Sequence, residues 1–116
     1  MMHFADVPVY LHREFVDFRK QINGLSLIVQ NCMNESVFEP GLFVFCNKKR
    51  DKLKVLYWDK TGFCLWHKRL EKDRFIWPRK CELKVIHWNH EQLNWLLRGF
   101  DVSQFKSHNE LKYKAI

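Results

Sequence analysis

The sequence lacks the features of several large protein classes. Its 116 residues fit one domain, and they include only 4 glycines and 3 prolines, which leaves little room for long linkers. No apolar run approaches the roughly 20 residues that a membrane-spanning helix needs. The first six residues lack the charged region and the long apolar region of a signal peptide. We therefore expect a cytoplasmic protein with no membrane partner and a single domain over residues 1–116.

Motifs of metal, redox and cofactor sites are also missing. The four cysteines are too far apart in the sequence for a zinc knuckle or a redox dithiol, and each lies in an apolar stretch, which predicts free, buried thiols. They are Cys32, Cys46, Cys64 and Cys81. The glycines are isolated, so the sequence has no glycine-rich phosphate loop. We expect no metal and no other cofactor.

No group of side chains predicts catalysis. Four acidic residues stand at predicted turns beside lysine or arginine, where turn formation or ion pairing explains them better than a catalytic metal cluster. They are Asp51, Asp59, Glu71 and Asp73. Cys46 and Cys64 lie in apolar strand positions, which disfavour the thiolate that a catalytic pairing with His67 would need. We therefore expect a binding protein with no catalytic residues, and not an enzyme.

Two helices are predicted from apolar residues that recur every three or four positions. The first spans residues 17–33, with a stripe of Phe18, Ile22, Leu25, Val29 and Cys32. The second spans residues 90–98, with a stripe of Leu93, Leu96, Leu97 and Phe100. Asn89 and Gln92 have the spacing of a capping box at the start of this second helix.

Most of the remaining chain alternates predicted strands with tight connections. Residues 42–46 are apolar throughout, which predicts a strand covered on both faces. Residues 52–58 begin with an alternation that places Lys52 and Lys54 on one face and Leu53 and Val55 on the other. Further strands are predicted over residues 7–12, 63–70, 74–77 and 83–87. We predict an α+β fold in which an antiparallel β-meander sheet packs with two helices.

Positive charge is distributed unevenly along the chain. The net charge is +7, and residues 48–84 contain 13 basic against 5 acidic residues, whereas the rest of the chain contains 7 basic and 8 acidic residues. The whole surplus therefore lies in about a third of the sequence. Such a concentration indicates an anionic partner, most commonly a nucleic acid.

Ten basic residues are the candidates for contact with phosphates, because lysine and arginine neutralise a nucleic-acid backbone and a helix N-terminus offers free N–H donors. They are Lys48, Lys49, Arg50, Lys52 and Lys54 on one hairpin, Lys68, Arg69 and Arg74 on the following strands and connections, and Arg19 and Lys20 at the start of the first helix.

These residues also have purely structural interpretations. Arg19 and Lys20 fit ion pairs with Glu14 or Asp17, and the basic strands fit a charged sheet face that keeps the protein in solution. Tryptophans interleaved with the basic residues either stack on bases or pack in the core. They are Trp58, Trp66 and Trp77.

Several segments resemble one protein family. The longest is Leu-Phe-Val-Phe-Cys-Asn-Lys-Lys-Arg-Asp-Lys-Leu-Lys-Val-Leu-Tyr-Trp-Asp over residues 42–59. Shorter ones are Tyr-Leu-His-Arg at 10–13, Asp-Phe-Arg-Lys at 17–20 and Lys-Arg-Leu-Glu at 68–71. Together they resemble the TnpB-like accessory proteins of the bacterial insertion sequences numbered sixty-six. The chain has Val16 where a proline is common before the Asp-Phe-Arg-Lys motif, which affects only the predicted start of the helix.

The resemblance implies an accessory protein of DNA transposition, encoded beside a separate and larger transposase that carries the catalytic carboxylates. The implied partners are the DNA of the insertion-sequence ends and this companion transposase. One hypothesis is direct DNA binding through the basic hairpin and its neighbouring strands. The other is a protein-interaction module that docks on the transposase without touching DNA.

Overall fold

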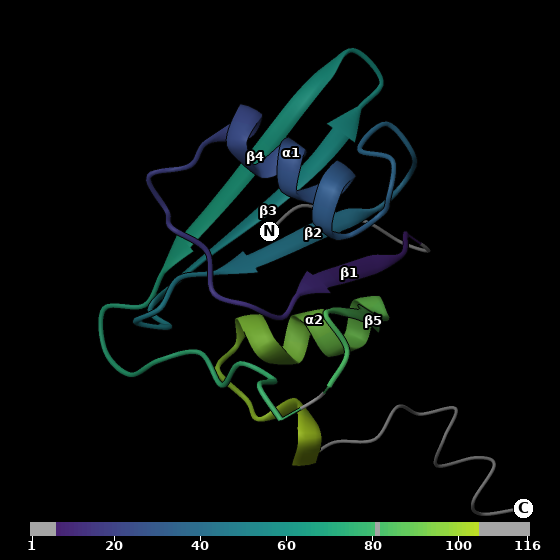
Figure 1. Cartoon of the computed structure of the whole chain (residues 1–116). Coiled ribbons are helices and arrows are strands. Elements are labelled where there is room, and N and C mark those ends of the chain that lie inside the picture. The colour runs from purple at the N-terminus through teal and green to yellow at the C-terminus, as the bar shows by residue number, and fades with distance from the viewer. Residues whose placement is uncertain (1–6, 81, 105–116) are drawn as a thin grey trace, which may run out of the picture.

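A five-stranded sheet with one helix on each face forms the described part of the chain (Figure 1). The computed structural model describes residues 7–80 and 82–104. Its strands are β1 (Val9–His12), β2 (Leu42–Cys46), β3 (Lys52–Asp59), β4 (Gly62–Arg69) and β5 (Val85–Trp88). Its helices are α1 (Ile22–Cys32), α2 (His90–Leu97) and the short 3-10 helix η1 (Val102–Gln104).

The sheet has the strand order β4-β3-β2-β1-β5. Strands β2, β3 and β4 form the predicted antiparallel meander, in which Val44 pairs with Val55 and Val55 with Trp66. β5 adds antiparallel to β1, whereas β1 lies parallel to β2. Parallel neighbouring strands need a long crossover connection, and the connection from β1 to β2, which contains α1, provides one. The α+β prediction is confirmed, with one parallel pair that the predicted meander lacked.

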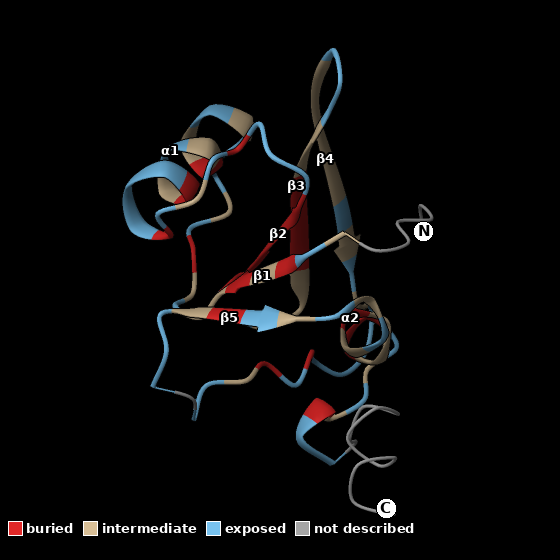
Figure 2. Cartoon of the chain, turned by 90° about the vertical axis from the view of Figure 1, so that its right-hand side faces the viewer, coloured by how far each residue is buried: buried red, intermediate tan, exposed pale blue. Residues whose placement is uncertain are grey.

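Both faces of the sheet are covered. β2 is buried at every position, as its unbroken apolar run predicted. On one face, α1 packs Leu25 and Val29 in a core with Phe43, Phe45 and Leu56. On the other face, α2 packs Leu93, Leu96 and Leu97 in a core with Val44 and Val55. Figure 2 shows the buried positions gathered on β2, β3 and the inner sides of the helices.

α1 begins at Ile22, later than predicted, because Asp17 closes a separate turn before it. The Oδ1 atom of Asp17 accepts a hydrogen bond from the backbone N–H of Arg19 at 2.9 Å, and its carbonyl accepts one from the N–H of Lys20 at 3.1 Å. The helix also ends differently from the prediction. Cys32 is exposed, and Met33, just beyond the helix, takes the buried position.

The prediction of a strand over residues 74–77 is wrong. Phe75 and Trp77 are buried while Arg74 and Ile76 are exposed, so the predicted alternation is present. The backbone N–H of Phe75, however, donates to the carbonyl of Arg50 at 2.7 Å, and Arg50 lies in a turn. A single hydrogen bond to a turn cannot start the repeated backbone pairing of a β-ladder. The segment therefore covers the core next to α2 without joining the sheet.

The predicted capping box at the start of α2 is confirmed. The side chain of Asn89 accepts from the N–H of Gln92 at 2.8 Å, and the side chain of Gln92 accepts from the N–H of Asn89 at 2.9 Å. Phe100, which was predicted in the buried stripe, is 41% exposed. Gly99 has a φ of +89° and turns the chain just before it, so Phe100 no longer follows the helical spacing.

Replacing Asn89 with alanine should lower the free energy of unfolding by about 1 kcal/mol, because the N–H of Gln92 loses its acceptor. Urea unfolding followed by tryptophan fluorescence measures the change. The matched control is alanine at Asn23, an exposed position of α1, where the change should stay below about 0.5 kcal/mol. Equal losses at the two positions would contradict a capping role for Asn89.

Candidate nucleic-acid interface

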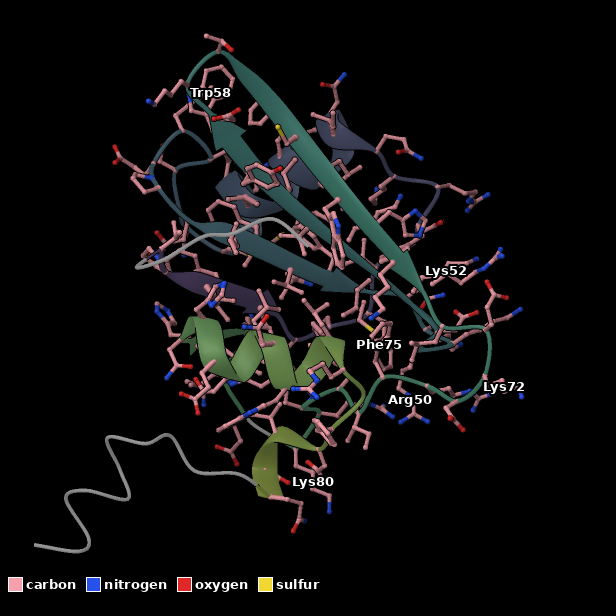
Figure 3. All side chains as sticks on the ribbon, turned by 180° about the vertical axis from the view of Figure 1, so that it is seen from behind. Arg50, Lys52, Trp58, Lys72, Phe75 and Lys80 are labelled. Carbon is pink, nitrogen blue, oxygen red and sulfur yellow. The ribbon has the colours of Figure 1, made fainter. Side chains whose placement is uncertain are left out.

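Most of the candidate basic residues lie at one end of the sheet, where β2 ends, β3 begins and β4 ends. We call residues 17–20, 47–52 and 68–74 the basic end. Figure 3 shows Arg50, Lys52 and Lys72 gathered there, with Trp58 at the opposite end of the sheet. In the sheet register Lys52 pairs with Arg69, and the N–H of Leu70 donates to the carbonyl of Asp51 at 2.8 Å. These contacts bring β4 and its following connection to the turn before β3.

The turn over residues 47–51 is built around the buried side chain of Asn47. Its Nδ2 donates to the carboxylate of Asp51 at 2.6 Å, and its Oδ1 accepts from the backbone N–H of Lys52 at 3.0 Å. This hydrogen bond from Asn47 is the main reason that the pKa of Asp51 is lowered, and Lys52 and Lys49 lower it further. The turn therefore holds Lys48 and Lys49 at the surface, as the sequence predicted.

Arg19 meets this turn although it lies some thirty residues earlier in the sequence. An open groove of about 630 Å³ is lined by residues 15–19 on one side and by Asn47, Lys48, Lys49 and Lys52 on the other. Its apolar lining residues are Phe15, Val16 and Phe18. Two groups of predicted phosphate contacts, Arg19 and the lysines of the turn, therefore lie around one groove and form its cationic rim. Lys20 follows Arg19 directly in the sequence.

Arg19 also forms the ion pair that the sequence left open. Its guanidinium donates to both carboxylate oxygens of Asp17, with the shortest distance 2.6 Å from Nη2 to Oδ2. These hydrogen bonds lower the pKa of Asp17 to about 2. The Arg19 side chain is nevertheless 91% exposed, so it remains accessible at the rim.

Lys54 is not a surface contact, which corrects the prediction for this residue. It is only 2% exposed, and its Nζ donates to the carbonyls of Phe18 and Lys20, both at 2.9 Å. The same ammonium lies 4.8 Å from the centre of the Phe18 ring. The alternation of β3 placed Lys54 on the correct face, but that face is covered by the segment before α1. Lys54 therefore positions the segment that carries Arg19 and Lys20.

Lys68 also has a structural partner. Its Nζ donates to the carbonyl of Leu97 at 2.8 Å, which places a cation at the negative end of α2. Arg69 is exposed and donates twice to Glu71, at 3.0 and 2.9 Å. Arg74 is exposed in the connection after β4. Of these three candidates, Arg69 and Arg74 present their charge to solvent.

His67 lies among cations on the α1 face of the sheet, next to the basic end. Its pKa is lowered first by desolvation and then by the charges of Lys54, Lys52 and Arg69. Lys54 is its direct partner in the register between β3 and β4. From the sequence, His67 was considered only as a catalytic base, and the register of the hairpin is the signal that would have placed it among these cations.

The tryptophans do not line the basic end. Trp77 is buried, with its Nε1 donating to the carbonyl of Arg13 at 2.8 Å, and Trp66 packs against the core on the α2 face. Trp58 contacts Phe38 and Phe63 at the opposite end of the sheet. The core interpretation therefore holds for Trp66 and Trp77.

The cysteines and acidic residues form no cluster in the described part of the chain. Among residues 7–80 and 82–104, no group of three or more His, Cys, Asp or Glu side chains is placed to hold a metal ion. Cys46 is buried, which raises its pKa to about 12, whereas Cys32 is exposed and contradicts the prediction of a buried thiol. Cys81 lies outside the described residues. No described helix has the length and apolar character needed to cross a bilayer.

Comparison with known proteins assigns the chain to a family. Residues 7–107 match the family described as IS66 Orf2 like protein. The chain belongs to the IS66 Orf2-like family. Two similar proteins of Sinorhizobium fredii are named uncharacterized protein y4jC, 34% identical over 91 residues, and uncharacterized protein y4hO, 35% identical over 96 residues. These alignments cover 78% and 83% of this chain, and 77% and 83% of the relatives. No solved structure matches.

Membership of the IS66 Orf2-like family confirms the resemblance predicted from the sequence, and it indicates an accessory role in transposition. The family match includes all three segments of the basic end, residues 17–20, 47–52 and 68–74. The groove and its cationic rim therefore lie within the part of the chain that matches the family.

Proposed function

We propose that this IS66 Orf2-like protein is a cytoplasmic, non-catalytic accessory protein that binds the DNA of insertion-sequence ends through its basic end and assists a separate transposase. The observation that supports this proposal most strongly is the convergence of cations from three separated segments. Arg19, Lys49 and Lys52 line one groove, and Arg69 pairs with Lys52 in the sheet. Cations gathered at one edge of a domain are typical of a surface that neutralises the phosphates of a DNA backbone.

The carboxylates at the basic end balance only part of the positive charge of its lysines and arginines. Asp17 and Glu71 each pair with one arginine, and Asp51 binds the side chain of Asn47. Lys48, Lys49 and Lys52 form no ion pair with any other described residue. In the free protein such lysines are balanced by mobile ions, and DNA binding releases the counterions condensed on the phosphates that they neutralise.

A gel-shift titration of the purified protein with duplex DNA from the insertion-sequence end tests the proposal. We expect binding that weakens steeply as salt increases, since each phosphate contact contributes about −0.9 to the slope of log affinity against log salt. A duplex of unrelated sequence is the control for specificity. A protein that binds neither duplex at low salt would overturn the proposal.

The second candidate function, docking on the transposase, is favoured by an aromatic cluster at the opposite end of the sheet. Phe38 is 56% exposed and makes edge contacts with Trp58, whose ring also contacts Phe63. Exposed aromatic groups of this kind are common at protein interfaces. Because the cluster lies away from the basic end, docking through it would leave the basic end free. Pull-down by the companion transposase with no gel shift would favour this second function.

Incubation with Mg²⁺ or Mn²⁺ should produce neither cleavage nor joining of insertion-sequence-end DNA, because two-metal catalysis needs converging carboxylates. Asp17 and Glu71 are each paired with an arginine, and Asp51 hydrogen-bonds to Asn47. Denaturing electrophoresis of end-labelled DNA measures the outcome. Metal-dependent cleavage that disappears in an Asp51→Asn or Glu71→Gln variant would contradict this expectation.

A further inference from the structure

A second basic depression lies next to the turn at residues 47–51. It is open, has a volume of about 790 Å³, and is lined by Leu70, Lys72, Asp73, Arg74, Ile76, Arg98 and Gly99. Lys72 and Arg74 come from the connection after β4, whereas Arg98 follows the end of α2. Neither Lys72 nor Arg98 is among the candidate phosphate contacts predicted from the sequence. The depression therefore gathers cations that the sequence keeps apart.

Two backbone hydrogen bonds fix this depression against the basic end. The N–H of Leu70 donates to the carbonyl of Asp51, and the N–H of Phe75 donates to the carbonyl of Arg50. Figure 3 shows Lys72 and Arg50 at the same end of the sheet. The depression lies on the α2 side of the sheet, since Phe75 and Leu70 belong to the core on that face. The groove with Arg19 is lined by Val16 and Phe18 of the α1 core and by Phe15, which packs against the α2 core, and the two hollows have no lining residue in common.

The C-terminal end of α2 has a cationic side-chain donor other than Arg98. The carbonyl of Leu97 already accepts from Lys68, which supplies the cation at this end of α2. The guanidinium of Arg98 instead lies 5.5 Å from the centre of the Phe100 ring, which holds an exposed side chain in a defined position. Asp73 is the one carboxylate among the lining residues, against three cations. The depression therefore carries a net positive charge.

We propose that Lys72, Arg74 and Arg98 form a second phosphate-binding position for the same nucleic acid, so that the DNA backbone crosses the basic end from the α1 side to the α2 side. This inference rests on the proposed function. A nucleic acid is favoured over an acidic peptide because the segment that carries Lys72 and Arg74 is hydrogen-bonded to the turn that carries Lys48, Lys49 and Arg50, so that the cations form one extended basic surface. An extended basic surface can contact several successive phosphates of a nucleic-acid backbone.

Changing Lys72, Arg74 and Arg98 together to glutamine should make the slope of log affinity against log salt shallower by about 3, measured by fluorescence anisotropy with an insertion-sequence-end duplex. All three side chains are exposed, so circular dichroism should show an unchanged fold. If the triple variant does not fold, Arg98→Gln alone should make the slope shallower by about 1. The matched control is Lys60→Gln, at the tip of the hairpin between β3 and β4, which should keep the parental slope.

The outcomes separate this inference from the proposed function. If the parent protein does not bind DNA, both are wrong. If the parent binds, and variants of the turn at residues 47–51 weaken it, but the depression variants behave like Lys60→Gln, then the inference is wrong and the proposed function stands. If the depression variants keep the parental salt slope and lose binding to the companion transposase, the depression is a protein-docking site and the inference is also wrong.

Discussion

Changing Lys48, Lys49 and Arg50 together to glutamine should reduce affinity for insertion-sequence-end DNA on the order of a hundredfold at low salt, and make the salt slope shallower by about 3. Lys48 and Lys49 are exposed in the turn, and both line the groove with Arg19. Each lost cation means one fewer phosphate neutralised and fewer counterions released. Fluorescence anisotropy at several salt concentrations measures both quantities.

The fold should survive this triple change. The turn depends on the side chain of Asn47, which binds Asp51 and the N–H of Lys52, and none of these residues is replaced. Arg50 has a φ of +62°, and glutamine has a similar preference at such a position, so little strain is added. Each substitution should change the free energy of unfolding by less than about 0.5 kcal/mol.

A second triple variant controls for the loss of net charge. Lys60, Lys80 and Lys84 are exposed and lie outside the basic end, so changing them to glutamine removes the same three charges from elsewhere. This control should bind DNA with nearly the parental salt slope. Equal losses in the two triple variants would show that only the overall charge of the protein matters, and that the basic end is not a defined site.

Features that depend on neighbouring residues were predictable from the sequence. The unbroken apolar run of β2 predicted burial on both faces, and the pair Asn89 and Gln92 predicted the capping box. The turn at residues 47–51 was also located, because an asparagine followed by charged residues between two apolar runs favours a turn. Each of these outcomes is decided within about five residues of chain.

Features that depend on what covers a strand were not predictable in the same way. The alternation of β3 assigned Lys54 to the correct face, but only the path of the chain before α1 shows that this face is closed. The predicted strand at residues 74–77, which contains Arg74, also failed for a tertiary reason, because this segment lies against a turn and not against a strand. The gathering of Arg98 with Lys72 depends on where α2 ends in space. Local pattern defines the faces, and the tertiary fold decides which charges remain at the surface.

Replacing Lys54 with methionine should lower the free energy of unfolding by about 2 kcal/mol and weaken DNA binding. The carbonyls of Phe18 and Lys20 each lose a charged donor, a change that costs about 1–3 kcal/mol for each unsatisfied group. Relief from burying an ammonium offsets part of this loss. Binding should weaken because the segment that carries Arg19 is no longer held beside the groove. Urea unfolding and fluorescence anisotropy measure the two effects.

The same substitution at Lys48 is the matched control, because Lys48 is an exposed lysine of the neighbouring turn. Lys48→Met should change the free energy of unfolding by less than about 0.5 kcal/mol, while the salt slope becomes shallower by about 1. A Lys54→Met variant that is as stable as the parent, and that loses one unit of salt slope, would show that Lys54 faces DNA directly and does not position the segment before α1.

The pH dependence of stability gives a further signature of Lys54. Its pKa is lowered from 10.5, first by desolvation and second by the charge of Lys52. Between the folded pKa and 10.5 the unfolded chain binds more protons at this position than the folded protein does, so the free energy of unfolding rises with pH across that interval. Lys54→Met removes this contribution. The stability of the parent relative to Lys54→Met should therefore increase as pH rises toward 10.5, and a constant difference would contradict the burial of a charged amine at Lys54.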